Sequence, residues 1–230
     1  MKQLGYSAFC PICILLTLFC LLTACGDDDD YHYPSVKLEF LTAYTDANGV
    51  VERVCTDAGE TWPVLQTSAA TVVKADTAYR IVTNYEPVTA SDGTQGVKLY
   101  AWSNAISPLP LPASEFKEGV RCEPAEVASI WMGYEYLNML LTVKQQGKHS
   151  LHFVEETVEV DTDSRCSTVY LSLYHAVTSE VQDYTKRAYL SVPLYPYLKD
   201  GVEKLKVFFS WINESGEKKT YSCEYTDLNP

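Results

Sequence analysis

The sequence predicts an all-β protein in which a small OB-like barrel is followed by an antiparallel β-sandwich. Apolar and polar residues alternate along many segments from residue 36 onward, and turns rich in Gly, Asn and Asp separate these segments. Helical periodicity is nearly absent. Of the 230 residues, 47% are hydrophobic and 21% are charged, which is typical of a globular chain.

The first 24 residues are predicted to be a secretory signal peptide. Lys2 is the only charged residue of this segment, and the apolar stretch 12–22 is too short for a comfortable membrane span. The cleavage site Leu22-Thr23-Ala24-Cys25 resembles the bacterial lipobox, in which the Cys is acylated and becomes the new N-terminus. The resemblance implies a permanent lipid anchor at Cys25, and the alternative is an ordinary signal peptide followed by an unrelated Cys.

Residues 25–35 are predicted to form an acidic linker. Asp27, Asp28, Asp29 and Asp30 are a run of like charges, which repel one another and stay solvated. Acidic residues directly after an acylated Cys also resemble the surface-export signal of Bacteroidetes lipoproteins. We therefore expect a protein anchored by lipid in the outer membrane and exposed on the cell surface, with a simple solvated linker as the alternative.

Residues 36–106 are predicted to form the barrel. The expected strands are 36–44, 50–56, 60–65, 79–88 and 97–104, and the first turn contains Asn48-Gly49, a pair that tolerates positive φ. Residues 66–76 are expected to form a short helix or an irregular connection. Three strands, a connector of helical length and two further strands follow the order of an OB-type barrel.

Residues 107–124 are predicted to be a linker and residues 125–230 a sandwich. Pro108, Pro110 and Pro112 alternate in the linker and favour an extended, stiff backbone. The expected strands of the sandwich are 136–143, 149–154, 168–174, 187–192, 204–212 and 218–225, each with apolar residues at alternate positions on one face. Sheets with one apolar face bury it by packing as a sandwich.

Short motifs along the whole mature chain are similar to those of one known family. They are Cys25 with the Asp run, Trp62-Pro63, the segment 130–134 (Ile-Trp-Met-Gly-Tyr), Asp200-Gly201-Val202 and the segment 217–221. This pattern resembles the NigD-like lipoproteins of Bacteroidetes. The resemblance implies an OB-like N-terminal domain and a C-terminal β-sandwich on the cell envelope, with no family catalytic residues. The family takes its name from a bacteriocin gene cluster, where an immunity role was proposed.

No motif indicates catalysis, so we expect a protein that is not an enzyme and that has no cofactor or metal. GxSxG, HExxH and Gly-rich phosphate loops are absent from the sequence. His149 and His152 are not expected to share a metal, because a spacing of three places them on opposite faces of a strand, and two exposed imidazoles of a hairpin are expected instead. Nothing in the spacing brings a base to Cys55 or Cys166, and His175 is therefore not expected to activate either thiol.

Charge and aromatic content limit the partners. The formal net charge is −12, which argues against nucleic acid because a duplex binder needs a basic face. The chain has 17 Tyr, and Trp62, Trp102, Tyr195 and Tyr197 are candidates for stacking on a sugar or for anchoring a partner protein. The alternative is that these rings simply suit half-buried strands. We expect a display module for an unknown protein or glycan, with glycan binding and bacteriocin immunity as alternative roles.

Four cysteines remain in the predicted mature chain besides Cys25. They are Cys55, Cys122, Cys166 and Cys223. An envelope location permits disulfides, and four cysteines allow three connectivities. Four free thiols are the alternative, and the sequence leaves both open.

Replacing Cys25 by Ala is expected to release the mature protein from membranes, because the acyl chains are its proposed anchor. Cell fractionation of Cys25→Ala measures the release, with Cys20→Ala in the signal peptide as the matched control. A Cys25→Ala protein that still partitions with membranes, or an unmodified Cys25 thiol in the mass spectrum of the native protein, contradicts the anchor.

Overall fold

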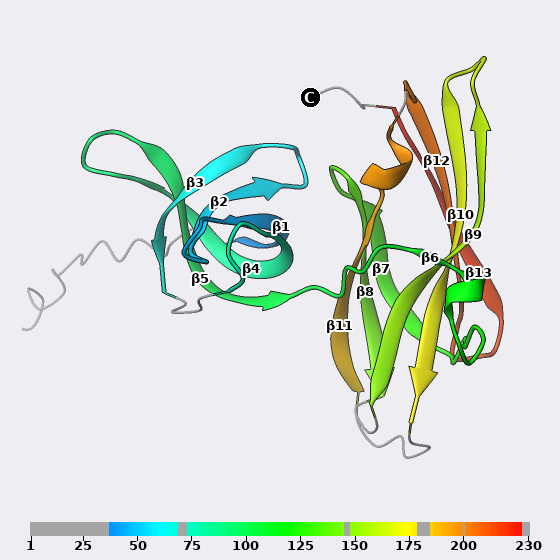
Figure 1. Ribbon diagram of the computed structural model, residues 1–230. Helices are drawn as coiled ribbons and strands as arrows, with labels where there is room; N and C mark the ends of the chain where they lie inside the picture. Colours follow the sequence, from blue (N-terminus) through cyan, green and yellow to red (C-terminus); the bar gives the residue numbers. More distant parts are fainter. Residues whose placement is uncertain (1–36, 69–72, 145–147, 179–184, 200, 227–230) are drawn as a thin grey trace, which may run out of the picture. The chain divides into compact units, whose positions relative to one another are not determined.

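The computed structural model describes residues 37–68, 73–144, 148–178, 185–199 and 201–226. The predicted fold class is confirmed, with a closed five-stranded barrel followed by a β-sandwich (Figure 1). Cys25 and the run from Asp27 to Asp30 lie outside the described residues. No helix among the described residues is long and apolar enough to cross a membrane.

The barrel closes in the order β1-β2-β3-β5-β4, with β4 pairing back onto β1. Its strands are β1 (Lys37–Thr45), β2 (Val51–Thr56), β3 (Thr61–Thr67), β4 (Ala78–Thr89) and β5 (Gln95–Asn104). The first predicted turn is found, and Gly49 adopts φ +76° there. The interior is filled by eight buried residues, namely Leu41, Ala43, Val51, Val54, Ile81, Tyr85, Val97 and Leu99.

The sandwich consists of a five-stranded sheet, β13-β12-β10-β9-β6, and a three-stranded sheet, β11-β8-β7. Its strands are β6 (Leu111–Pro112), β7 (Glu126–Met132), β8 (Tyr136–Lys144), β9 (His149–Asp161), β10 (Cys166–Val177), β11 (Thr185–Pro193), β12 (Lys204–Ile212) and β13 (Lys218–Tyr225). The 3₁₀ turns η1 (Ala113–Glu115) and η2 (Tyr195–Tyr197) join them. Pairing is antiparallel except for β10 with β12 and β6 with β9.

Alternation along the sandwich strands places the predicted apolar residues in one core. Leu137, Met139 and Leu141 of β8 are fully buried, as are Val169 of β10 and Phe209 of β12. Side chains at alternate positions of a strand share one face, so each sheet contributes one apolar face to this core.

The segment 107–124, which we predicted to be a linker, lies against the sandwich instead. Leu111 pairs with Val154 at the edge of the five-stranded sheet, and Cys122 forms an isolated bridge with His175. The Phe116 ring stacks on Tyr174 with 4.6 Å between the ring centroids. Alternating prolines are compatible with this placement, because an extended edge strand leaves one side of its backbone unpaired.

The outside of the barrel contacts the outer face of the three-stranded sheet. Leu41 of β1 points into the barrel, so its neighbours Phe40 and Thr42 point out, yet they are 5% and 6% exposed. On β8, Asn138 lies between inward-facing Leu137 and Met139 and is nevertheless fully buried. Both domains therefore bury residues on faces that would be exposed to solvent if the domains were separate.

A buried arginine, Arg80 of β4, holds these two faces together. Its Nε donates to the Ser191 hydroxyl at 2.9 Å, one terminal nitrogen donates to Asn138 at 3.0 Å, and the other donates to Thr42 at 3.3 Å. The guanidinium also forms an ion pair with Asp57, which follows β2. Asn138 donates in turn to the second Asp57 oxygen at 2.7 Å. A buried charge is tolerated when it is paired and hydrogen-bonded, as Arg80 is by Asp57 and by its three neutral acceptors.

Gly133 is required beside this network. A Cβ atom there would lie 2.5 Å from the Asp57 carboxylate and 2.7 Å from the Asn138 amide nitrogen. A side chain of any size at position 133 would push the barrel turn away from β8. The glycine of the Trp-Met-Gly segment thus permits the two domains to approach.

Replacing Arg80 by Met is expected to lower the free energy of unfolding by about 3–5 kcal/mol, because it leaves the partly buried Asp57 carboxylate without its counter-charge. Urea unfolding of the mature protein measures the loss. Arg53→Met is the matched control, since the Arg53 side chain is 46% exposed and should contribute less than about 1 kcal/mol. Equal losses in the two variants would contradict the role given to Arg80.

Candidate functional site

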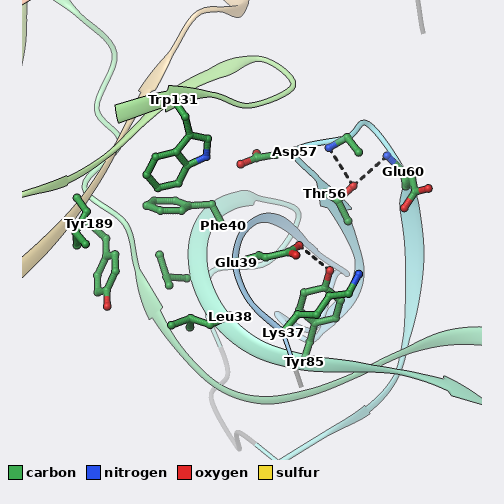
Figure 2. A pocket seen from close by; sticks show the side chains of 13 residues that line it. Lys37, Leu38, Glu39, Phe40, Thr56, Asp57, Glu60, Tyr85, Trp131 and Tyr189 are labelled. Atoms are coloured by element: carbon green, nitrogen blue, oxygen red, sulfur yellow. Dashed lines mark hydrogen bonds between the residues drawn. The ribbon is translucent and has the colours of Figure 1, made fainter. Parts of the chain in front are cut away.

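A pocket of about 500 Å³ lies between the barrel and the three-stranded sheet (Figure 2). Its size is within the range of small-molecule sites. Ten lining residues come from the barrel, namely Lys37, Leu38, Glu39, Phe40, Thr56, Asp57, Ala58, Glu60, Val82 and Tyr85. Three come from the sandwich, namely Trp131 of β7, Leu140 of β8 and Tyr189 of β11.

One wall of the pocket is aromatic. Phe40 is its centre, and the Trp131 and Tyr189 rings meet it edge-to-face with centroid distances of 5.5 and 6.0 Å. Figure 2 shows the indole of Trp131 directly beside the Phe40 ring. Trp131 is 37% exposed, so part of the indole remains available to a ligand. Such rings offer a large contact area at a low cost in conformational entropy.

The opposite side of the pocket carries charged groups. Glu39 points into the pocket and accepts a hydrogen bond from the Tyr85 hydroxyl at 2.8 Å (Figure 2). Burial, the hydrogen bond to Glu39 and the charge of Glu39 raise the pKa of Tyr85, so this phenol remains a donor. Glu60 accepts from the Trp62 indole at 3.4 Å, and Asp57 is engaged by Arg80 and Asn138. Lys37 lies at the rim, 6.0 Å from the Tyr85 ring centroid.

The pocket and the Arg80 network are built on the same strands. Phe40 and Thr42 are two residues apart on β1, and both point out of the barrel. Leu140 and Asn138 are two residues apart on β8 and point the same way. The network therefore fixes the spacing between the pocket's two walls.

The aromatic residues proposed from the sequence do not converge on one site. Trp62 and Trp102 pack against the barrel core. Tyr197 is buried and donates its hydroxyl hydrogen to Glu155 at 2.6 Å, whereas Tyr195 is 40% exposed with its ring edge-to-face with Tyr136. These placements match the alternative of half-buried rings for all but Tyr195.

Sequence reasoning missed the pocket residues Phe40 and Tyr189 as a site. Trp131 was noticed only as part of the family motif. The available signal was the run of buried positions along β1, where Phe40 to Ala43 are all buried although strands of a one-layer barrel should alternate. Such a run indicates a second packed face, but it does not identify what covers that face.

All four cysteines are free thiols in the structure. Burial raises the pKa of Cys223 to about 11 and also raises the pKa of Cys55 above its ordinary value. Both thiols therefore stay protonated near neutral pH and are poor nucleophiles. The cysteine that pairs with His175 is Cys122, through an isolated β-bridge of the backbone, rather than Cys55 or Cys166.

His149 is not the exposed imidazole that we expected. It is half-buried and stacks on His175, with 2.9 Å between His149 Nδ1 and His175 Nε2. His175 Nδ1 lies 3.0 Å from the Glu123 carbonyl oxygen, which can only accept, so this nitrogen carries the proton. Antiparallel pairing places His149 opposite Val177, and His175 lies two residues from Val177 on the same face of β10. His152 is half-buried as well, with the Phe116 ring edge-to-face against it.

The structure is expected to lose stability as the pH falls below about 6.5, the ordinary pKa of histidine. Burial lowers the pKa of His175, and the charge of His149 lowers it further. The unfolded chain therefore binds the proton more tightly, so the contribution is complete above pH 6.5 or so and declines below it. Urea unfolding from pH 8 to 5 measures this slope.

His175→Gln should flatten the slope of unfolding free energy against pH, and His152→Gln should leave it unchanged. An unchanged slope in His175→Gln would show that other groups cause the pH dependence.

Comparisons with known proteins place the chain in a family. The model of the NigD-like C-terminal beta sandwich domain matches residues 108–225. A NigD-like immunity protein from Bacteroides caccae is 30% identical, with a TM-score of 0.69 over 85% of this chain and 99% of that one. Comparison with curated proteins finds no match.

Two more distant structures share the fold alone. A protein of unknown function from Bacteroides vulgatus is 18% identical, with a TM-score of 0.63 over 83% of this chain and 91% of that one. A candidate lipoprotein from Bacteroides fragilis is 14% identical, with a TM-score of 0.56 over 84% and 98%. The family match over half of this chain and the 30% identical relative together show that the chain belongs to the NigD-like family.

Proposed function

We propose that the protein is a non-enzymatic lipoprotein, anchored in the outer membrane through Cys25 and exposed on the cell surface, that binds a ligand in the pocket between its two domains. The observation that carries the binding role is the pocket itself, an aromatic wall facing charged groups across about 500 Å³. The proposed location at the cell surface rests on the acylation motif at Cys25 and on the run of Asp residues after it. The candidate lipoprotein of the same fold agrees with it.

A binding role suits the pocket better than a catalytic one. Its carboxylates Glu39, Asp57 and Glu60 already accept hydrogen bonds from Tyr85, Arg80 and Trp62. These hydrogen bonds hold the carboxylates in place, and Glu39 and Glu60 keep acceptor capacity for a ligand. Groups that are fixed by neighbours can orient a bound ligand.

The pocket is close to the proposed anchor along the chain. Lys37, Leu38 and Glu39 line it and are the first residues of β1. Twelve residue steps separate Cys25 from Lys37, and a fully extended chain of this length spans at most about 42 Å. A ligand of this pocket is therefore bound near the membrane surface.

Glycan binding and immunity are both compatible with this pocket. Aromatic side chains such as Trp131 stack on sugars, and the Bacteroides caccae relative is named an immunity protein. Each role requires the same event, the capture of a molecule outside the cell. The pocket can be tested without choosing between them.

Trp131→Ala is expected to abolish binding on an array that carries both polysaccharides and short peptides, because it removes the exposed ring of the pocket. Tyr195→Ala is the matched control, since its ring is similarly exposed but does not line the pocket. Loss of binding in Tyr195→Ala, or equal signals from Trp131→Ala and the unmodified protein, would contradict the pocket as the site.

The surface location has its own test. Proteinase K should digest the protein on intact cells, and replacing the four residues Asp27–Asp30 by Asn should protect it while membrane attachment persists. Digestion that is unchanged in the Asn variant would contradict the role of the acidic run.

A further inference from the structure

One wall of the pocket offers a cation the exposed part of the Trp131 indole, beside the Phe40 and Tyr189 rings. Trp131 and Tyr189 both pack against Phe40, and these rings are held between two strand systems rather than on a loop. Aromatic faces carry negative electrostatic potential and attract ammonium and guanidinium groups, more strongly when the site is shielded from water. The wall is therefore suited to an organic cation as well as to an apolar group.

The charged groups that remain available in the pocket are mainly acidic. Arg80 neutralises Asp57, so this carboxylate adds no unpaired charge. Glu39 and Glu60 each accept one hydrogen bond, from neutral donors, and keep further acceptor capacity. Among the described residues that line the pocket, only Lys37 is basic.

The hydrogen-bonding character of these groups selects among ligands. Glu39 and Glu60 are acceptors only, whereas a sugar hydroxyl both donates and accepts. Ammonium and guanidinium groups have donors and no acceptor, so they are complementary to a pair of carboxylates beside aromatic rings. Lys37 shows the same chemistry within the chain, with its ammonium over the Tyr85 ring beside Glu39.

We propose that the pocket recognises an organic cation, an ammonium or guanidinium group presented by a basic peptide. This inference rests on the proposed binding role of the pocket and specifies its ligand. The cation lies against the exposed indole of Trp131, and Glu39 supplies the counter-charge. Lys37 competes with the ligand for Glu39. The overall charge of −12 favours the approach of such a peptide.

The test uses two peptides that differ only in charge, an acetylated Gly-Arg-Arg-Gly amide and its citrulline analogue. Isothermal titration of the mature protein should show binding of the arginine peptide and at least about tenfold weaker binding of the citrulline peptide, as expected for a desolvated cation over aromatic rings. Repeating the titration at a higher salt concentration distinguishes a buried contact from long-range attraction. Salt screens interactions between exposed charges more than interactions between buried ones.

Three variants distinguish the pocket from general surface charge. Glu39→Gln should weaken the binding of the arginine peptide about tenfold. The amide oxygen of the new side chain can still accept the hydrogen bond from Tyr85. Lys37→Gln should strengthen binding several-fold. Glu118→Gln is the matched control, because it removes the same charge from an exposed loop residue outside the pocket and should change affinity little.

The other outcomes of these titrations contradict the cation site, and one of them still supports the pocket as a binding site. Equal affinity for the two peptides, or equal weakening by Glu39→Gln and Glu118→Gln, overturns the cation site. A polysaccharide that binds and is lost in Trp131→Ala, while the arginine peptide does not bind, also overturns it but upholds the binding role of the pocket.

Discussion

Arg80 links the two domains of this protein through one buried guanidinium whose side chain is only 2% exposed. It reaches Asp57 and Thr42 within the barrel and Asn138 and Ser191 of the sandwich. The Tyr136 ring lies 4.2 Å from its carbon and covers it. Because each of these polar groups is buried or partly buried, separating the domains would leave several of them without partners, and such groups are costly to leave unsatisfied. The arrangement of the two domains is specified by polar pairing as well as by apolar contact.

The pocket depends on that arrangement. Its aromatic wall combines Phe40 of the barrel with Trp131 and Tyr189 of the sandwich, so neither domain contains the wall alone. The backbone connection is also short and bonded, since Ile106 pairs with β11 and the Ser107 hydroxyl donates to the Ser191 carbonyl at 2.6 Å. Sites at domain boundaries are common for ligands because two rigid walls enclose more surface than one. Here the neutralisation of Asp57 by Arg80 also decides which carboxylates remain for a ligand.

Several elements were predictable because their cause is local. Strands such as β12 and β13 have the predicted bounds, since alternation and the turn between Asn213 and Glu217 are encoded within a few residues. β9 was predicted to end at Val154 but continues to Asp161, because its acidic second half pairs with β10 although its two apolar residues, Val158 and Val160, are exposed. The predicted linker forms an edge of the sandwich for a similar reason, as its partners Val154 and His175 are distant in sequence.

The sequence by itself determined the fold class, the family and the expected address, since alternation, turn residues and the Cys25 motif are all readable over short windows. The tertiary structure alone decided the pocket, the partners of Arg80 and the pairing of His149 with His175. The physical reason is that each of these joins residues of strands that are distant in the sequence, where the sequence shows only that a polar or aromatic residue stands at an alternate position. Whether such a residue meets water or a residue of another strand depends on contacts that form only in the folded protein.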